Sequence, residues 1–94
     1  MNEPRVRISP HALEQIRLRK LTIEQVVRVV TGPEQITVAA HGRYFAESRI
    51  ETDRKNFLLR VLIERLEENE YVVLLVLTVY PTSKLSRYWR GGAK

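Results

Sequence analysis

The sequence predicts an α+β domain in which two N-terminal helices pack on an antiparallel β-sheet of about four strands. Two stretches near the N-terminus combine a helix-capping residue with apolar side chains at helical spacing, which indicates the two helices. Beyond Pro33 the apolar side chains recur at every second position, which is the period of a β-strand. The 94 residues are expected to form one domain, 1–94, in which residues 91–94 are a frayed tail.

The first helix is expected to begin at Ser9-Pro10, because serine caps a helix N-terminus and proline fits its first position. Arg5 to Ile8 alternates polar and apolar side chains and is expected to form a short strand. Thr22 to Gln25 has the pattern of a capping box and begins the second helix, which Gly32-Pro33 ends. The N-terminal part is therefore predicted to be a short strand followed by a helical hairpin.

Three further stretches have the patterns of strands. Ile36 to Ala40 and Tyr44 to Ile50 are expected to form a hairpin that turns at His41-Gly42. Phe57 to Leu66 fits a strand or, through leucines four residues apart, a helix; its β-branched residues favour the strand. Tyr71 to Tyr80 is apolar on both faces, so we expect a central strand that is covered on both sides.

Two helices can cover only one face of such a sheet. The opposite face is then expected to carry apolar side chains that need a cover, namely Leu58, Leu62, Leu74 and Val76. A homodimer or a dedicated protein partner would provide that cover. Residues 82–90, at the end of the chain, are expected to form a short helix or an edge strand.

The chain contains no cysteine, which excludes disulfides and thiolate chemistry and fits a reducing compartment. No apolar stretch follows the first residues, so no signal peptide is expected. The longest apolar run, Val72 to Leu77, is much shorter than the roughly 20 residues that a membrane-spanning helix needs. We therefore expect a cytoplasmic protein without a membrane segment.

The net charge of +5 is concentrated at the two ends of the chain. Residues 1–20 carry five basic and two acidic side chains, and residues 82–94 carry four basic side chains and no acidic one. If the two ends meet in space, they form one basic patch that binds phosphates. The alternative is a charged surface with a basic tail.

Five short motifs bear on the family of the chain. They are Ser9-Pro10-His11-Ala12-Leu13, Leu21-Thr22-Ile23-Glu24-Gln25-Val26, Gly32-Pro33, Leu59-Arg60-Val61 and Leu77-Thr78-Val79-Tyr80. In this order, with a basic strand before the first and an arginine-rich helix end after it, they resemble a family of small bacterial domains of unknown function. That family is placed with the RelE/ParE/BrnT-like toxin superfamily. The resemblance covers about Val6 to Tyr80.

The resemblance implies a RelE-like fold, with two helices followed by a sheet. Many RelE-like and BrnT-like members are ribonucleases that an antitoxin neutralises, whereas ParE-like members act on DNA gyrase. The resemblance thus implies a toxin–antitoxin system, with RNA, free or bound to the ribosome, as the substrate. It also implies an antitoxin-like protein as the partner.

Cleavage of RNA without a metal ion needs a base, an acid and cations that stabilise the phosphate charge. His11, near a helix N-terminus, is a candidate base or acid, and its alternative is a structural hydrogen bond. Arg49 and Arg60 are predicted on the sheet face away from the helices, where they would bind phosphate; the alternatives are a solvated face or ion pairs with Glu47 and Glu64. Tyr80 is a third catalytic candidate, because RelE-like enzymes use basic residues on the sheet and an aromatic residue near the C-terminus.

The candidate RNA-binding residues are basic: Arg17, Arg19, Lys20, Arg49, Lys84 and Arg87. The cluster at the end of the first helix also suits the negative end of the helix dipole, which is its alternative role. Tyr88-Trp89 would stack on bases or pack against the edge of the sheet.

No cofactor and no metal site are expected, because the two histidines stand thirty residues apart without acidic residues in ligand spacing. Two function classes remain. The first is an endoribonuclease toxin in which the 2′-hydroxyl of the RNA is the nucleophile, since the chain offers neither metal ligands nor a cysteine. The second is a non-catalytic module that binds nucleic acid or protein, and a gyrase-directed toxin is also compatible with the resemblance.

Overall fold

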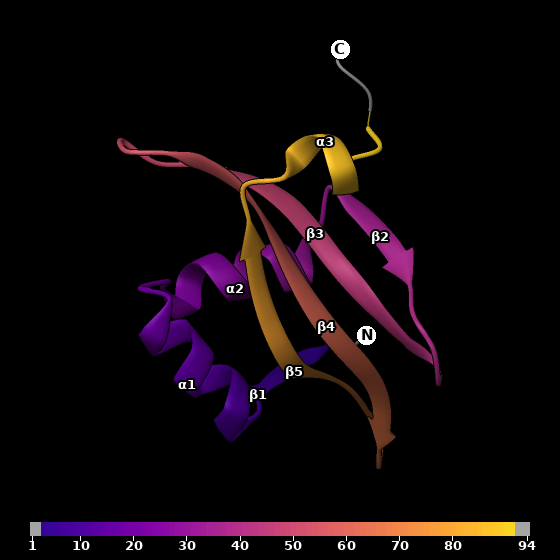
Figure 1. Ribbon diagram of the computed structural model, residues 1–94. Helices are drawn as coiled ribbons and strands as arrows, with labels where there is room; N and C mark the ends of the chain where they lie inside the picture. The colour runs from indigo at the N-terminus through magenta and orange to yellow at the C-terminus, as the bar shows by residue number, and fades with distance from the viewer. Residues whose placement is uncertain (1–2, 92–94) are drawn as a thin grey trace.

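The fold was determined from a computed structural model, which describes residues 3–91 (Figure 1). Along the chain the elements are β1 (Arg5–Ile8), α1 (Pro10–Leu18), α2 (Ile23–Thr31), β2 (Gln35–Val38), β3 (Arg43–Glu51), β4 (Asn56–Glu68), β5 (Tyr71–Thr82) and α3 (Leu85–Tyr88). The two predicted helices and the strand assignment for residues 57–66 are confirmed. Of the two forms expected for residues 82–90, the helix is present. Residues 92–94 of the expected tail lie outside the described residues.

The sheet has five strands in the order β1-β5-β4-β3-β2. β1 runs parallel to β5, and the other neighbours are antiparallel. The prediction of an antiparallel sheet of about four strands is therefore wrong in strand number and in direction. β1 pairs with β5, the strand farthest from it in the sequence. Hydrophobic periodicity describes one segment at a time, so it carries no information about pairing over that distance. β5 is an interior strand, as predicted, because it lies between β1 and β4.

Local side-chain caps fix where α1 and α2 begin. The Ser9 hydroxyl accepts a hydrogen bond from the Ala12 backbone N–H at 3.1 Å, and Pro10 fills the first helical position. Thr22 and Gln25 form the predicted capping box, with each side chain accepting from the backbone N–H of the other residue at 3.0 Å. Each cap satisfies N–H groups that a helix leaves unpaired at its start.

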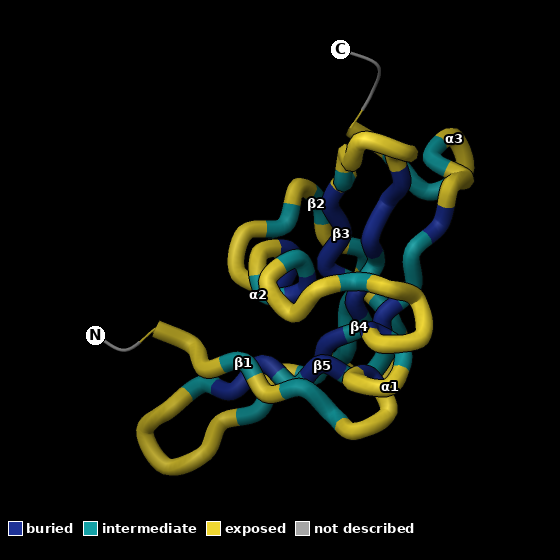
Figure 2. The backbone as a smooth tube through the Cα atoms, turned by 90° about the vertical axis from the view of Figure 1, so that its left-hand side faces the viewer, coloured by how far each residue is buried: buried dark blue, intermediate teal, exposed yellow. Residues whose placement is uncertain are grey.

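The hydrophobic core lies between the two helices and one face of the sheet (Figure 2). α1 contributes Ala12 and Ile16, and α2 contributes three valines. The sheet supplies alternate residues that point toward the helices: Ala46, Phe57, Leu59, Val61, Ile63, Leu74, Val76 and Val79. We call the opposite face of the sheet the distal face.

A β-bulge in β5 reverses which residues face the helices. Leu62 pairs with Thr78 whereas Ile63 pairs with Val76, so Leu77 has no residue opposite it on β4. Before the bulge Val76 faces the helices, and after it Val79 does. Just after the bulge, the Val79 backbone N–H donates a hydrogen bond to the Gln15 side-chain oxygen of α1, at 2.8 Å.

The expectation of an uncovered apolar face is wrong, and the bulge is the physical reason. Leu74 and Val76 were expected on the face away from the helices, but both belong to the core under α1 and α2. Leu58 does lie on the distal face, yet it is fully buried within the chain, and Leu62 there is half-buried. These residues therefore do not require a partner to cover them. Among residues 3–91, no helix is long and apolar enough to cross a membrane.

Candidate nucleic-acid interface

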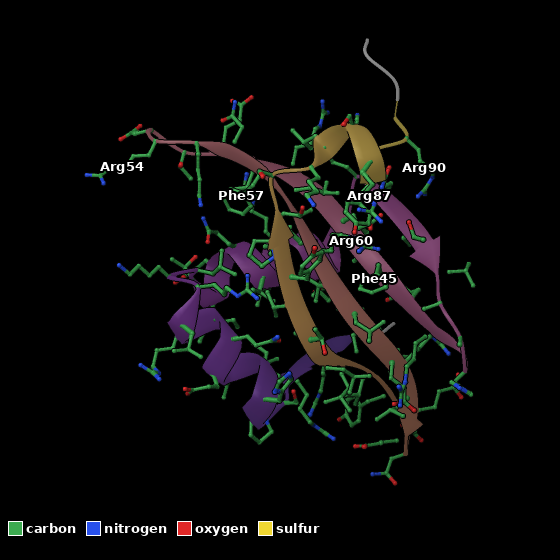
Figure 3. All side chains as sticks on the ribbon, viewed as in Figure 1. Phe45, Arg54, Phe57, Arg60, Arg87 and Arg90 are labelled. Carbon is green, nitrogen blue, oxygen red and sulfur yellow. The ribbon has the colours of Figure 1, made fainter. Side chains whose placement is uncertain are left out.

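Arg60 occupies the centre of the distal face. Its Nε donates to the Glu47 Oε2 at 2.5 Å, and its guanidinium carbon lies 4.1 Å from the Phe45 ring centroid and 4.2 Å from that of Tyr88. Figure 3 shows Arg60 with Phe45, Arg87 and Arg90 on this side of the sheet. The Arg60 side chain is only 12% exposed, so it is fixed between an acid and two rings.

Glu47 is a buried carboxylate with three hydrogen-bond donors. Besides Arg60, the Gln35 Nε2 donates to it at 2.6 Å and the Thr37 hydroxyl at 2.7 Å. Burial raises the pKa of Glu47, but the hydrogen bonds from Arg60, Thr37 and Gln35 outweigh it and leave the pKa below its usual value. The carboxylate is therefore ionised at neutral pH and balances the Arg60 charge.

The C-terminal segment is docked onto the same network. Gln35 donates from Nε2 to the Tyr88 carbonyl at 3.0 Å and accepts from the Arg90 backbone N–H at 3.0 Å. The Arg90 guanidinium donates to the Thr37 hydroxyl at 2.6 Å and to the Ile36 carbonyl at 2.8 Å. These contacts hold α3 and the residues that follow it over the distal face.

Trp89 is held by an arginine that has its own acidic partner. The guanidinium carbon of Arg49 lies 4.2 Å from the Trp89 ring centroid, and the Arg49 Nε donates to the Glu34 Oε1 at 3.0 Å. Arg49 therefore lies on the distal face, as predicted, and its charge is already paired.

Tyr80, near the end of β5, is another titratable group on this face with a shifted pKa. Its ring meets the Tyr88 ring edge to face, with 6.3 Å between centroids, and lies 5.7 Å from the Arg60 guanidinium carbon. Hydrogen bonds with Tyr88 and Thr82 lower the pKa of the Tyr80 hydroxyl, and the charges of Lys84 and Arg60 add to that effect. A phenol with a lowered pKa gives up its proton more readily than an ordinary tyrosine.

We call the surface around α3 on the distal face the α3 surface. Its basic side chains are Arg49, Arg60, Lys84, Arg87 and Arg90, and its aromatic side chains are Tyr80, Tyr88 and Trp89. Its acidic side chains, Glu34 and Glu47, are both engaged in ion pairs. Lys84 and Arg87 are exposed and form no ion pair with a described carboxylate. Exposed cations beside aromatic rings are the elements from which proteins build single-strand binding surfaces.

The other sequence-predicted residues lie elsewhere. His11 is exposed in the first turn of α1, on the helix side of the sheet, while Arg60 points from the distal face. The sheet thus separates these two candidates, so they do not share one site in this fold. Arg17 pairs with Glu14 on α1, and Arg19 and Lys20 line a pocket beside the second helix.

Several residues that belong to the α3 surface or contact it were not identified from the sequence. Gln35, Phe45 and Arg90 had no assigned role, and Glu47 was considered only as an ion-pair partner of Arg60. Gln35 and Arg90 are 55 positions apart, and no short motif links them. The one available signal was a lone acid, Glu47, in a strand that also carries the apolar Phe45 on the same side.

No group of three or more histidine, cysteine or acidic side chains within residues 3–91 is arranged to bind a metal ion. A scan against protein-family models finds no matching family, and searches of curated proteins and of solved structures find no match.

Proposed function

We propose that this domain binds single-stranded RNA on the α3 surface. The observation that carries the proposal is the stack of Phe45, Arg60 and Tyr88, with ring-to-cation distances of 4.1 and 4.2 Å, beside the unpaired cations Lys84 and Arg87. The stack fixes α3, and α3 presents the cations. The resemblance to RelE-like and BrnT-like ribonucleases favours RNA over other anionic ligands.

The roles of the side chains follow from their exposure. Lys84 and Arg87 are exposed and contact the phosphates of the strand. Tyr80 and Trp89 are half-buried, so each offers part of its ring to a base. Arg60 is almost fully enclosed and positions α3 rather than reaching a phosphate.

The test is a binding titration of a short single-stranded RNA at several salt concentrations. The double variant Lys84→Ala/Arg87→Ala should bind single-stranded RNA of any base sequence more weakly than the wild type does. The slope of log affinity against log salt should flatten by about 1.4, since each phosphate contact on a single strand contributes about 0.7. Arg65→Ala removes a charge of the same sign from an exposed arginine that pairs with Glu67 and should leave the slope unchanged. An unchanged slope in the double variant would exclude the α3 surface as the RNA site.

A second candidate function is cleavage of the bound RNA, as in a toxin-like endoribonuclease. The lowered pKa of Tyr80 next to Lys84 and Arg60 favours it. The Tyr80 phenolate would take the proton of the 2′-hydroxyl, whose oxygen then attacks the adjacent phosphorus. The new bond joins the 2′-oxygen to phosphorus, the bond from phosphorus to the 5′-oxygen breaks, and the leaving oxygen takes a proton from Lys84 or water.

Cleavage by this route leaves a 2′,3′-cyclic phosphate, and a strand with deoxyribose at the cleaved position should be resistant. Tyr80→Phe should slow cleavage by about 10²- to 10⁴-fold, the size expected for a lost proton-transfer group, while RNA binding persists. Cleavage that continues unchanged in Tyr80→Phe would exclude this role. If neither free nor ribosome-bound RNA is cut, the binding module remains as the function.

A further inference from the structure

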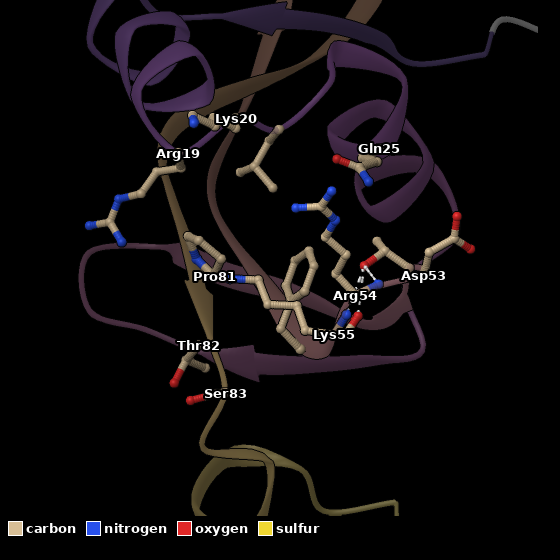
Figure 4. A pocket seen from close by; sticks show the side chains of 12 residues that line it. Arg19, Lys20, Gln25, Asp53, Arg54, Lys55, Pro81, Thr82 and Ser83 are labelled. Atoms are coloured by element: carbon tan, nitrogen blue, oxygen red, sulfur yellow. Dashed lines mark hydrogen bonds between the residues drawn. The ribbon is translucent and has the colours of Figure 1, made fainter.

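A pocket of about 680 Å³ lies outside the α3 surface, between three connections of the chain (Figure 4). Its walls come from the link between α1 and α2, from the turn between β3 and β4, and from the end of β5. The volume is in the range of small-molecule sites in proteins. Four basic residues line it: Arg19, Lys20, Arg54 and Lys55.

These four cations lack acidic partners, in contrast to most arginines of the described chain. Seven arginines among residues 3–91 form ion pairs with carboxylates: Arg7, Arg17, Arg43, Arg49, Arg60, Arg65 and Arg90. None of the four pocket cations lies within ion-pair distance of a described carboxylate, although Asp53 also lines the pocket. The pocket therefore has a surplus of positive charge that the chain itself does not neutralise.

The pocket cations come from opposite walls. Figure 4 shows Arg54 and Lys55 reaching in from the β3–β4 turn, opposite Arg19 and Lys20. The Thr52 hydroxyl fixes that turn, because it accepts from the Lys55 backbone N–H at 3.1 Å and donates to the Lys55 carbonyl at 2.9 Å. The backbone from which these two cations project is thus held in place.

Lys20 stands where glycine would be more stable. Its φ of 58° is left-handed, and its backbone N–H donates to the Arg17 carbonyl at 3.2 Å just after α1 ends. Helices commonly end on a glycine in this conformation, because a side chain there is strained. A lysine at this position keeps a charge in the pocket at the expense of stability, which points to a ligand.

Part of the wall is apolar. Phe57, Pro81 and Leu21 line the pocket beside the hydroxyls of Thr82 and Ser83. A ligand that fits both parts carries a concentrated negative charge and a flat or apolar group. A phosphate monoester carries close to two negative charges at neutral pH, twice the charge of the diester inside an RNA strand. Four unpaired cations suit the monoester better.

We propose that this pocket binds the 5′-phosphate of a nucleotide, with the base or sugar against Leu21 and Pro81. The phosphate belongs either to a free nucleotide or to the first residue of an RNA strand. The second source rests on the proposed RNA binding, whereas the first does not.

Calorimetric titration with adenosine 5′-monophosphate, adenosine and inorganic phosphate tests the proposal. Adenosine monophosphate should bind most tightly and adenosine least. Arg54→Ala should weaken binding of the monophosphate by about tenfold or more, the usual loss for one charged hydrogen bond. Arg28→Ala, which removes an exposed arginine of α2 outside the pocket, should not change it.

The variant Lys20→Gly should change ligand affinity and folding stability in opposite directions, so a loss of binding cannot be explained by unfolding. It should raise the midpoint of thermal unfolding, because it relieves the left-handed strain, and should weaken monophosphate binding. Equal binding of adenosine and its monophosphate, or full affinity in both Arg54→Ala and Lys20→Gly, would overturn the proposal.

Two further binding measurements identify the source of the phosphate. A 5′-phosphorylated RNA that binds more tightly than its 5′-hydroxyl counterpart, with the difference lost in Arg54→Ala, assigns the pocket to an RNA end. If the monophosphate binds but the 5′-phosphate of RNA makes no difference, the ligand is a free nucleotide. An unchanged salt slope in Lys84→Ala/Arg87→Ala would exclude the α3 surface alone, and full monophosphate affinity in both Arg54→Ala and Lys20→Gly would exclude the pocket alone, so the two proposals fail separately.

Discussion

Arg60 and Glu47 form an ion pair that is withdrawn from water, with 12% and 1% of the two side chains exposed and 2.5 Å between Nε and Oε2. The pair joins β3 to β4, and the donors Gln35 and Thr37 extend it to β2. Because Arg60 also stacks on Tyr88, the same pair supports α3. The distal face therefore has a polar core that organises the candidate interface.

Loss of one member of this pair should be costly. Glu47→Leu leaves the Arg60 charge buried without its partner and should lower the free energy of unfolding by about 3–5 kcal/mol. The double variant Glu47→Leu/Arg60→Met removes both charges and should recover much of that loss. Urea unfolding, followed by circular dichroism, measures the free energy of unfolding of each variant. If the double variant loses as much stability as the single variants Glu47→Leu and Arg60→Met lose together, the two charges are not coupled.

The stability of the protein should depend on Glu47 in acid. Its pKa in the folded protein lies below the ordinary value of 4.5, so from about pH 4.5 downward the unfolded chain binds a proton that the folded chain does not. The stabilisation is complete above that pH and is lost as pH falls through the lowered pKa. Urea unfolding of wild type and Glu47→Gln from about pH 6 to pH 3 should show two curves that converge in acid. Parallel curves would contradict the lowered pKa.

The contact between α1 and the bulge in β5 should contribute to stability. Gln15→Leu removes the acceptor of the buried Val79 N–H and should cost about 1–3 kcal/mol. Gln15→Glu keeps an acceptor oxygen and should cost less. Equal losses in both variants, measured by thermal unfolding, would mean that the hydrogen bond contributes nothing.

Substitution of His11 tests the separation of the two faces. His11→Ala changes an exposed side chain on the helix side of the sheet, away from the α3 surface. RNA affinity, and any cleavage, should therefore remain as in wild type. A loss of cleavage of about 10²-fold or more, with the fold intact, would place His11 in the chemistry and contradict the assignment to Tyr80.

Much of the fold could be read from local patterns. Ser9-Pro10 and the Thr22–Gln25 capping box place the helix starts correctly, because a cap acts within four residues. The turn at His41-Gly42 was also predicted, and both residues have positive φ there, 63° and 73°. The placement of Arg49 and Arg60 on the face away from the helices follows from the strand period of two.

The bulge shows where that period fails. Counting alternate residues along 71–80 puts Leu74 on the same side as Tyr80, but the extra residue at Leu77 places them on opposite faces. A bulge arises from the pairing between β4 and β5, and a single strand carries no mark of it. The expectation of an uncovered apolar face failed for this reason.

The sequence by itself determined the helices, the strands and the basic character of the chain, because caps, turns and hydrophobic periods act between neighbouring residues. Only the tertiary structure decided which distant side chains meet. It paired β1 with β5, set Gln35 beside Arg90, enclosed Arg60 between Glu47 and Tyr88, and left four cations unpaired around one pocket. Those contacts depend on how the strands are ordered and twisted in three dimensions, and pairing across fifty residues leaves no periodic signal in the chain.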